Sequence, residues 1–74
     1  MKTAPAPLFA VSLLRLPQVM EQTGLSRSEI YRRVAAGRFP RPTKLGHASA
    51  WSSIEVTMWV EARLNERDLS GGDG

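Results

Sequence analysis

The chain contains no cysteine and a single histidine, and aromatic residues make up only 7% of its 74 residues. Without cysteine it has neither disulfide bonds nor a thiolate metal site, and one histidine cannot bind zinc by itself. No apolar run approaches the roughly 20 residues needed to span a bilayer. The N-terminal apolar patch is a poor signal peptide, because prolines precede it and Arg15 interrupts its end. We therefore expect a cytoplasmic protein with no metal and no cofactor.

Groups of residues that could support catalysis are missing as well. The sequence has no histidine–carboxylate–nucleophile set and no glycine-rich loop that could cradle a phosphate. A chain of 74 residues allows one small domain with a modest core, in which a solvent-shielded cleft is hard to build. These absences favour a binding protein over an enzyme, and they favour a macromolecular partner over a small-molecule substrate.

The charge is unevenly distributed along the chain. Residues 26–47 contain six basic side chains and one acidic one, whereas residues 48–74 contain two basic and five acidic ones. A basic centre beside an acidic end is typical of a protein with one face for a polyanion. The simpler interpretation is that the arginines only keep a small domain in solution.

The segment from Thr23 to Gly37 has the pattern of two helices joined by a tight turn. Ser26 and Glu29 have capping-box spacing, in which each residue's side chain accepts a hydrogen bond from the other's backbone N–H. Gly24 and Gly37 stand where each helix needs a left-handed residue in order to end. Two helices joined by a short turn that contains glycine form a helix-turn-helix.

The rest of the chain completes a winged helix-turn-helix, a mainly α fold with a small β-hairpin. Pro40 and Pro42 exclude helix after the second helix, and a second capping box at Ser52 and Glu55 opens a last helix. We expect these elements: a short strand or extended lead-in at 13–16, helices at 17–23, 27–36 and 53–67, and a two-stranded wing at 43–45 and 48–51. The domain is then 13–67, between a disordered segment 1–12 and a flexible tail 68–74.

Apolar spacing predicts which residues form the core. The first helix should point Leu16, Val19 and Met20 inward, and Leu25 should fill the turn. Ile30 and Val34 share the inner face of the second helix, and we expect Phe39 and Trp51 to pack in the core rather than stack on bases. The last helix should close the core with one face: Val56, Trp59, Val60 and Leu64.

The outer face of the second helix carries the candidate DNA contacts. Arg27 and Arg32 are candidates for base or phosphate contacts, because the arginine fork fits O6 and N7 of guanine together. Ser28 is a candidate for a short hydrogen bond. Tyr31 either contacts a phosphate or a thymine methyl group, or it is a half-buried packing residue. Arg33 is either a further DNA contact or a surface arginine whose stem lies along the core.

The wing supplies further basic candidates. Arg38, Arg41 and Lys44 lie on a proline-stiffened segment, which loses little entropy when it docks against phosphates. His47, at the tip, either contacts phosphate or the minor groove, or is an exposed turn residue.

Several motifs together resemble the AlpA family of prophage and mobile-element regulators, which is related to excisionases and to the MerR-like winged-helix fold. They are Leu14-Arg-Leu-Pro-Gln-Val, Thr23-Gly-Leu-Ser-Arg-Ser-Glu-Ile-Tyr-Arg, Gly37-Arg-Phe-Pro-Arg-Pro-Thr-Lys-Leu-Gly, Trp51 and Val56-Thr-Met-Trp-Val-Glu-Ala-Arg. The resemblance covers residues 14–67. It matches the recognition helix at Ser26, Arg27, Ser28, Tyr31 and Arg32, and the wing at Arg38, Arg41 and Lys44. The turn at Gly46 departs from the pattern, because no arginine or second glycine precedes Trp51.

The resemblance implies a bacterial, nucleoid-associated protein that binds duplex DNA at operator or attachment-site repeats. Such proteins activate excision genes, or they bend attachment-site DNA so that an integrase excises the element. Ile54 and Met58 share a separate face of the last helix, and they form a candidate interface for self-association on DNA, if residues at the N-terminus do not cover them. The alternative is a protein-interaction module that binds an integrase or a polymerase without reading DNA.

Overall fold

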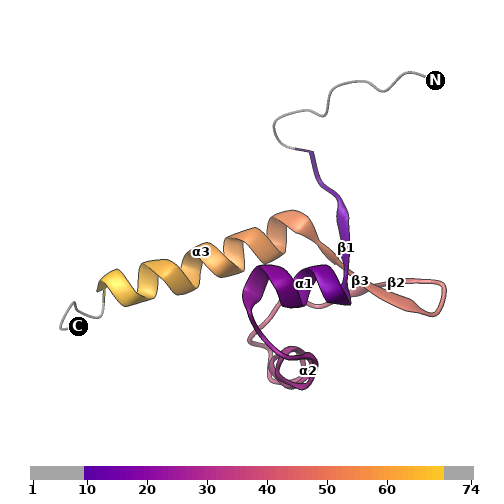
Figure 1. Ribbon diagram of the computed structural model, residues 1–74, viewed down its shortest axis with the longest axis horizontal. Helices are drawn as coiled ribbons and strands as arrows, with labels where there is room; N and C mark the ends of the chain where they lie inside the picture. The colour runs from indigo at the N-terminus through magenta and orange to yellow at the C-terminus, as the bar shows by residue number, and fades with distance from the viewer. Residues whose placement is uncertain (1–9, 70–74) are drawn as a thin grey trace.

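The computed structural model describes residues 10–69, with side chains up to residue 67, and its helices and strands follow the expected order (Figure 1). The elements are β1 (Leu13–Arg15), α1 (Leu16–Thr23), α2 (Arg27–Ala35), β2 (Thr43–Leu45), β3 (Ala48–Ser52) and α3 (Ser53–Leu69). This is a winged helix-turn-helix, as the sequence predicts. The expected disordered segment 1–12 and flexible tail 68–74 lie largely outside the described residues.

Local capping explains why α2 begins where it does. The backbone N–H of Glu29 donates to Ser26 Oγ at 3.2 Å, and the backbone N–H of Ser26 donates to Glu29 Oε1 at 2.8 Å. This confirms the capping box, which satisfies N–H groups that have no partner inside the helix. Gly24 ends α1 with φ 78°, a conformation that costs glycine little. The turn between the helices is therefore set by the local sequence.

The wing belongs to a three-stranded antiparallel sheet, with strand order β1-β3-β2. The sequence predicts only two paired strands. The third strand is β1, which pairs with β3 so that Leu14 lies opposite Trp51. Just before β1, Ser12 and Ser53 exchange two hydrogen bonds, from Ser12 N–H to Ser53 Oγ and from Ser53 N–H to Ser12 O. The lead-in to the helix-turn-helix is thereby joined to the start of α3.

The hydrophobic core draws side chains from nearly every helix and strand. Its buried members are Val19, Ile30, Phe39, Trp51 and Val56, and the partly buried Leu14, Leu16, Met20, Leu25, Val34 and Trp59 pack against them. The expected inner faces of α1 and α2 are confirmed, as are the core positions of the turn leucine, Phe39 and Trp51.

The core does not extend along the whole of α3. Val56 is fully buried, but Leu64 is 45% exposed, so the prediction that Leu64 closes the core is wrong. The reason is the length of the helix, because the C-terminal half of α3 projects past α1 and α2 (Figure 1). The apolar face continues along the helix after the elements that could cover it have ended.

Candidate nucleic-acid interface

The outward face of α2 is polar and basic. Arg27, Ser28 and Arg32 are exposed there, as expected for residues opposite the buried Ile30. Tyr31 is 37% exposed, and its ring lies 6.0 Å from that of Trp51 at 59°. The tyrosine therefore packs against the core, as one of its two predicted roles requires, and a third of its surface remains open to a ligand.

Ser26 has a structural role as the N-cap of α2. Its hydroxyl caps α2 and lies 3.4 Å from Ser28 Oγ, so the capping bond already uses one of its lone pairs. Glu29 completes the cap, and the hydrogen bonds with Ser26, together with the charges of Arg32 and Arg33, lower the pKa of its carboxyl group. The acidic residue in this basic stretch is thus tied to the helix start.

The segment between α2 and β2, residues 36–42, is held by two indole groups. Trp51 Nε1 donates to the carbonyl oxygen of Pro40 at 2.9 Å, and Trp59 Nε1 donates to the carbonyl oxygen of Arg38 at 2.8 Å. Phe39, between these two carbonyls, is 5% exposed and makes an edge contact with Trp59, with ring centroids 4.9 Å apart. This linker is therefore a fixed support for the exposed side chains of Arg38 and Arg41.

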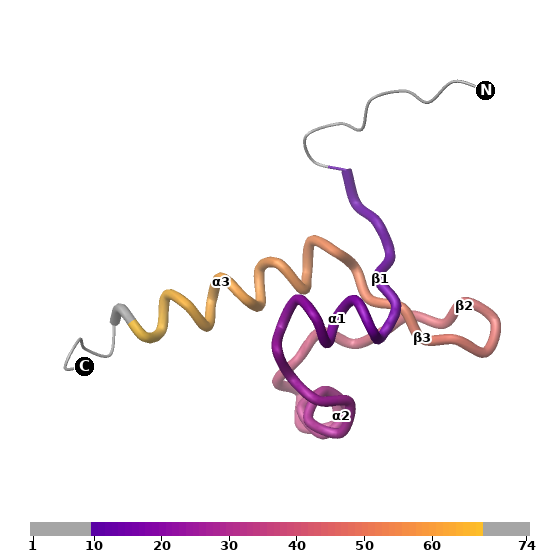
Figure 2. Tube along the Cα trace, in the orientation of Figure 1, coloured from indigo at the N-terminus to yellow at the C-terminus, as the bar shows by residue number. Residues whose placement is uncertain are grey.

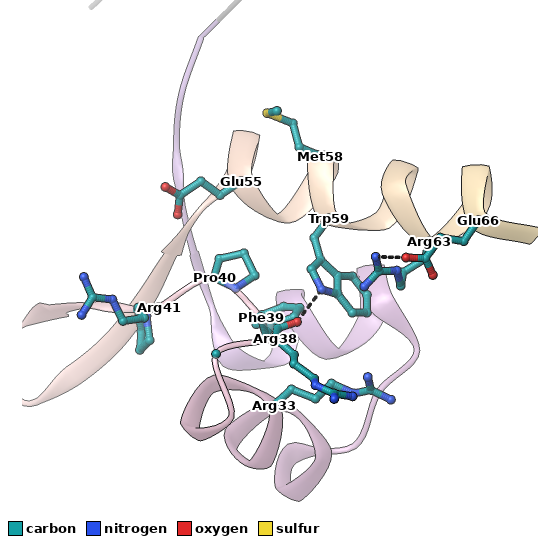
Figure 3. A pocket seen from close by; sticks show the side chains of 12 residues that line it. Arg33, Arg38, Phe39, Pro40, Arg41, Glu55, Met58, Trp59, Arg63 and Glu66 are labelled. Carbon is teal, nitrogen blue, oxygen red and sulfur yellow. Dashed lines mark hydrogen bonds and ion pairs between the residues drawn. The ribbon is translucent and has the colours of Figure 1, made fainter. Parts of the chain in front are cut away.

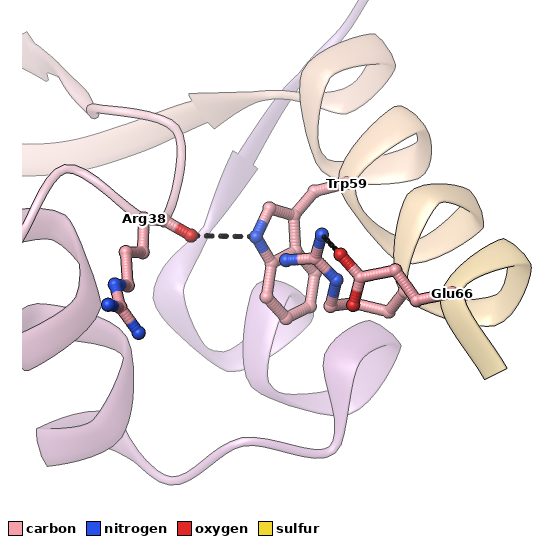
Figure 4. Close-up of polar contacts among 4 residues, drawn as sticks. Arg38, Trp59 and Glu66 are labelled. Atoms are coloured by element: carbon pink, nitrogen blue, oxygen red, sulfur yellow. Dashed lines mark hydrogen bonds and ion pairs between the residues drawn. The ribbon is translucent and has the colours of Figure 1, made fainter. Parts of the chain in front are cut away.

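The sequence places both tryptophans in the core and does not indicate what their N–H groups bind. Indole N–H groups in a core generally find an acceptor, so two tryptophans at expected core positions predict two bonds, but the acceptors depend on the tertiary fold. Trp59 is thus a residue of the candidate interface that sequence reasoning misses, because it acts through the backbone of Arg38 (Figure 4).

The hairpin carries the remaining basic candidates. Lys44 is exposed on β2, and its Nζ lies 3.4 Å from Oγ of Ser49, the residue opposite it on β3. His47 is exposed in the turn between the strands. This turn and the C-terminal half of α3 lie at opposite ends of the molecule (Figure 2). The candidate residues therefore lie on α2, on the hairpin and on the linker that joins them.

Arg33 differs from the other arginines of α2. It is half-buried, its guanidinium carbon lies 6.0 Å from the centre of the Trp59 ring, and its Nε is buried with no hydrogen-bond partner. It lines a broad groove of about 1140 Å³ between the linker and α3 (Figure 3). Arg63 lines the same groove, lies 5.1 Å from the Trp59 ring and pairs with Glu66.

Ile54 and Met58, the candidate interface on α3, are 37% and 64% exposed. Other large apolar side chains are also open to solvent, including Val11, Leu13 and Leu45. No helix in residues 10–69 has the length and apolar character to cross a membrane. Over the same part of the chain, no three histidine, cysteine, aspartate or glutamate side chains are grouped so that they could hold a metal ion.

The paired helices, the hairpin beside them and the closing helix define a winged helix-turn-helix protein with a basic second helix. Comparison with known proteins agrees with this class. Residues 12–64 match the family described as prophage CP4-57 regulatory protein (AlpA). The chain belongs to this family of phage regulatory proteins, as its motifs indicate.

A relative from a phage supports the same assignment. The chain is 46% identical over 55 residues to the uncharacterized protein ORF88 of Enterobacteria phage P4. The matched segment covers 73% of this chain and 62% of the phage protein, so the chain corresponds to less than two thirds of that relative. No solved structure gives a significant match to the chain.

Proposed function

We propose that the chain binds double-stranded DNA sequence-specifically, through a domain formed by residues 13–67. It acts as a transcriptional regulator, as a recombination directionality factor, or as both, for a prophage or an integrative element. Membership of a family named for a prophage regulatory protein supports the regulatory part of the proposal. The DNA-binding part rests on the geometry of α2.

The observation that carries the proposal is the row of exposed polar and basic side chains on α2. Recognition helices enter the major groove with their N-terminal residues on base edges. Arg27 and Ser28 stand in the first turn of α2, and Arg32 follows one turn later. The capping box fixes the start of this helix, so these side chains are held in place before DNA binds.

The hairpin and the linker add contacts to the DNA backbone. Arg41, Lys44 and His47 are exposed along this part of the chain, and basic side chains that meet phosphates add affinity without reading sequence. Because two indole N–H groups fix the backbone of the linker, that backbone loses little entropy when the arginine side chains bind.

Self-association on DNA is the second part of the proposal. Ile54 and Met58 leave apolar surface exposed near the start of α3, and neighbouring copies on repeated sites gain affinity from contact with each other. If the chain acts in recombination, an integrase is a further partner of the chain.

One observation favours a protein partner instead of DNA. The groove between the linker and α3 mixes Arg41 and Arg63 with Glu55, Glu66 and the exposed Met58. Carboxylates repel phosphates, so this mixture suits a protein segment with charges of both signs and apolar side chains better than a DNA backbone. An integrase or a polymerase is the candidate partner under this alternative.

Fluorescence anisotropy of a labelled duplex of scrambled sequence, titrated with protein at several salt concentrations, separates the two functions. DNA binding through phosphates weakens linearly on a log–log plot, with a slope that reports the number of contacts. A slope of several units supports DNA binding. No binding at low salt contradicts it and favours the protein-interaction module.

A further inference from the structure

A second hollow, of about 430 Å³, lies at the C-terminal end of α2. Its lining within residues 10–67 consists of Ala36 and three arginines, Arg32, Arg33 and Arg38. Unlike the groove against α3, it has no carboxylate in this lining. Three positive charges therefore border one open space without a negative charge among them.

The fold holds two of these arginines side by side. The backbone N–H of Arg38 donates to the carbonyl oxygen of Arg33 at 2.8 Å, and the carbonyl oxygen of Arg38 accepts from Trp59 Nε1 at 2.8 Å. Figure 3 shows the two side chains extending toward the same side of the molecule, beneath Trp59. The backbone bonds thus fix the positions from which both arginine side chains reach the same hollow.

Within the described part of the chain, Arg33 and Arg38 form no salt bridge, and the carboxylate whose charge acts on Arg33 is that of Glu29. The buried Nε of Arg33 has no hydrogen-bond partner there. Glu29, one turn earlier on α2, accepts its hydrogen bond from Ser26 at the other end of the helix. The face of Trp59 offsets part of the cost by a cation–π contact with Arg33 at 6.0 Å.

We propose that Arg33 and Arg38 form a binding site for one phosphate oxyanion, which a phosphodiester of the DNA backbone occupies. The planar guanidinium groups suit this ligand because their forked donors match phosphate oxygens. The proposal rests on the proposed DNA binding and makes it more specific. It assigns Arg33 and Arg38 to the DNA backbone, and it leaves the bases to residues on the outward face of α2.

The test compares the salt slope of duplex binding for the unaltered chain and for a variant with both Arg33→Gln and Arg38→Gln. Each phosphate contact contributes about one unit to the slope. We expect the double variant to lower the slope by about 1 unit, and to weaken selected and scrambled duplexes by the same factor. A double variant with an unchanged slope overturns the proposal.

Two controls make the result specific. Arg63→Gln removes the other guanidinium that lies against Trp59, at 5.1 Å, but this residue does not line the hollow, so its slope should stay unchanged. Replacing Arg33 and Arg38 by lysine keeps both charges and should restore most of the slope, which separates a lost contact from a damaged fold. Thermal unfolding of each variant checks that it is folded.

The failures of the two proposals are distinguishable. If the unaltered chain shows no salt-dependent binding, the proposed DNA binding fails and the backbone site fails with it. If the unaltered chain binds and the double variant keeps its slope, only the site is wrong.

A titration with inorganic phosphate, followed by the ¹⁵N resonance of Arg33 Nε, distinguishes the two sources of the ligand. A shift of this resonance with duplex, together with a lower salt slope for the double glutamine variant, supports the backbone phosphodiester. A shift with inorganic phosphate, combined with an unchanged duplex slope, identifies a site for the free anion and overturns the assignment to DNA.

Discussion

Trp59 Nε1 donates a 2.8 Å hydrogen bond to the carbonyl oxygen of Arg38, across 21 positions of the sequence. This bond joins α3 to the linker that follows α2. Because the acceptor is a backbone atom, Trp59 fixes the position of Arg38 while leaving its guanidinium group free to bind.

Trp59→Phe should therefore loosen the linker without emptying the core. The phenylalanine ring can still meet Phe39, but the hydrogen bond to Arg38 is lost, which costs about 0.5–1.5 kcal/mol of unfolding free energy. Trp51→Phe should cost more, because Trp51 is fully buried and its partner is the Pro40 carbonyl. Urea denaturation of both variants measures this, and a larger loss for Trp59→Phe would contradict the prediction.

Base reading and backbone contact predict different effects for two basic residues. Arg32→Ala should cost about 1–3 kcal/mol on a selected duplex and less on a scrambled one, because the lost contact reads sequence. Lys44→Ala is the matched control, and it should weaken both duplexes alike. The measurement is anisotropy with both duplexes at one salt concentration. Equal losses on the two duplexes for Arg32→Ala would show that Arg32 does not read bases.

The cap of α2 predicts a dependence of stability on pH. The pKa of Glu29 lies below its usual value of 4.5, chiefly because its carboxylate accepts from the Ser26 backbone and hydroxyl. A lowered folded-state pKa means that ionised Glu29 stabilises the fold above pH 4.5, and that this contribution is lost as the pH falls through the folded-state value. Glu29→Gln keeps an acceptor for Ser26 and removes the titration.

The expected result is a difference in unfolding free energy between Glu29→Gln and the unaltered chain that is present at neutral pH and shrinks on acidification. Urea denaturation at pH 7 and below pH 4 measures it. A difference that stays constant over this range would mean that the charge of Glu29 adds nothing to the cap.

Self-association on DNA should depend on Met58. Met58→Glu places a charge on an exposed apolar position of α3 and should abolish assembly on a long duplex, as measured by sedimentation. Leu64→Glu adds the same charge at another exposed apolar position, six residues later and on a different side of the helix, and should leave assembly unchanged. Assembly that is equal for both variants, or absent for the unaltered chain, would contradict an interface at this face.

Local patterns predict most of the fold because the capping residues, glycines and prolines act on their neighbours. Ser26, Glu29 and Gly24 mark the ends of α1 and α2, and the structure confirms the helices on both sides of the turn. The pairing of β1 with β3 cannot be predicted in this way, because it joins residues such as Leu14 and Trp51 that lie far apart in the sequence.

The candidate site is predictable in part for the same reason. The helical period identifies Arg27, Ser28 and Arg32 as exposed, and they are. It does not separate Arg33 from them clearly, because the position of Arg33 depends on Trp59, which reaches it from another helix. Long-range contacts therefore decide which arginines face outward freely and which are held against α3.

Amide NMR of the ¹⁵N-labelled chain, titrated with a duplex selected from a random pool, tests most directly whether α2 reads DNA. Shift changes concentrated at residues 26–48, with residues 60–67 unaffected, are the predicted result. Changes confined to the groove between the linker and α3, or no change at low salt, would contradict DNA recognition by α2 and indicate a protein partner instead.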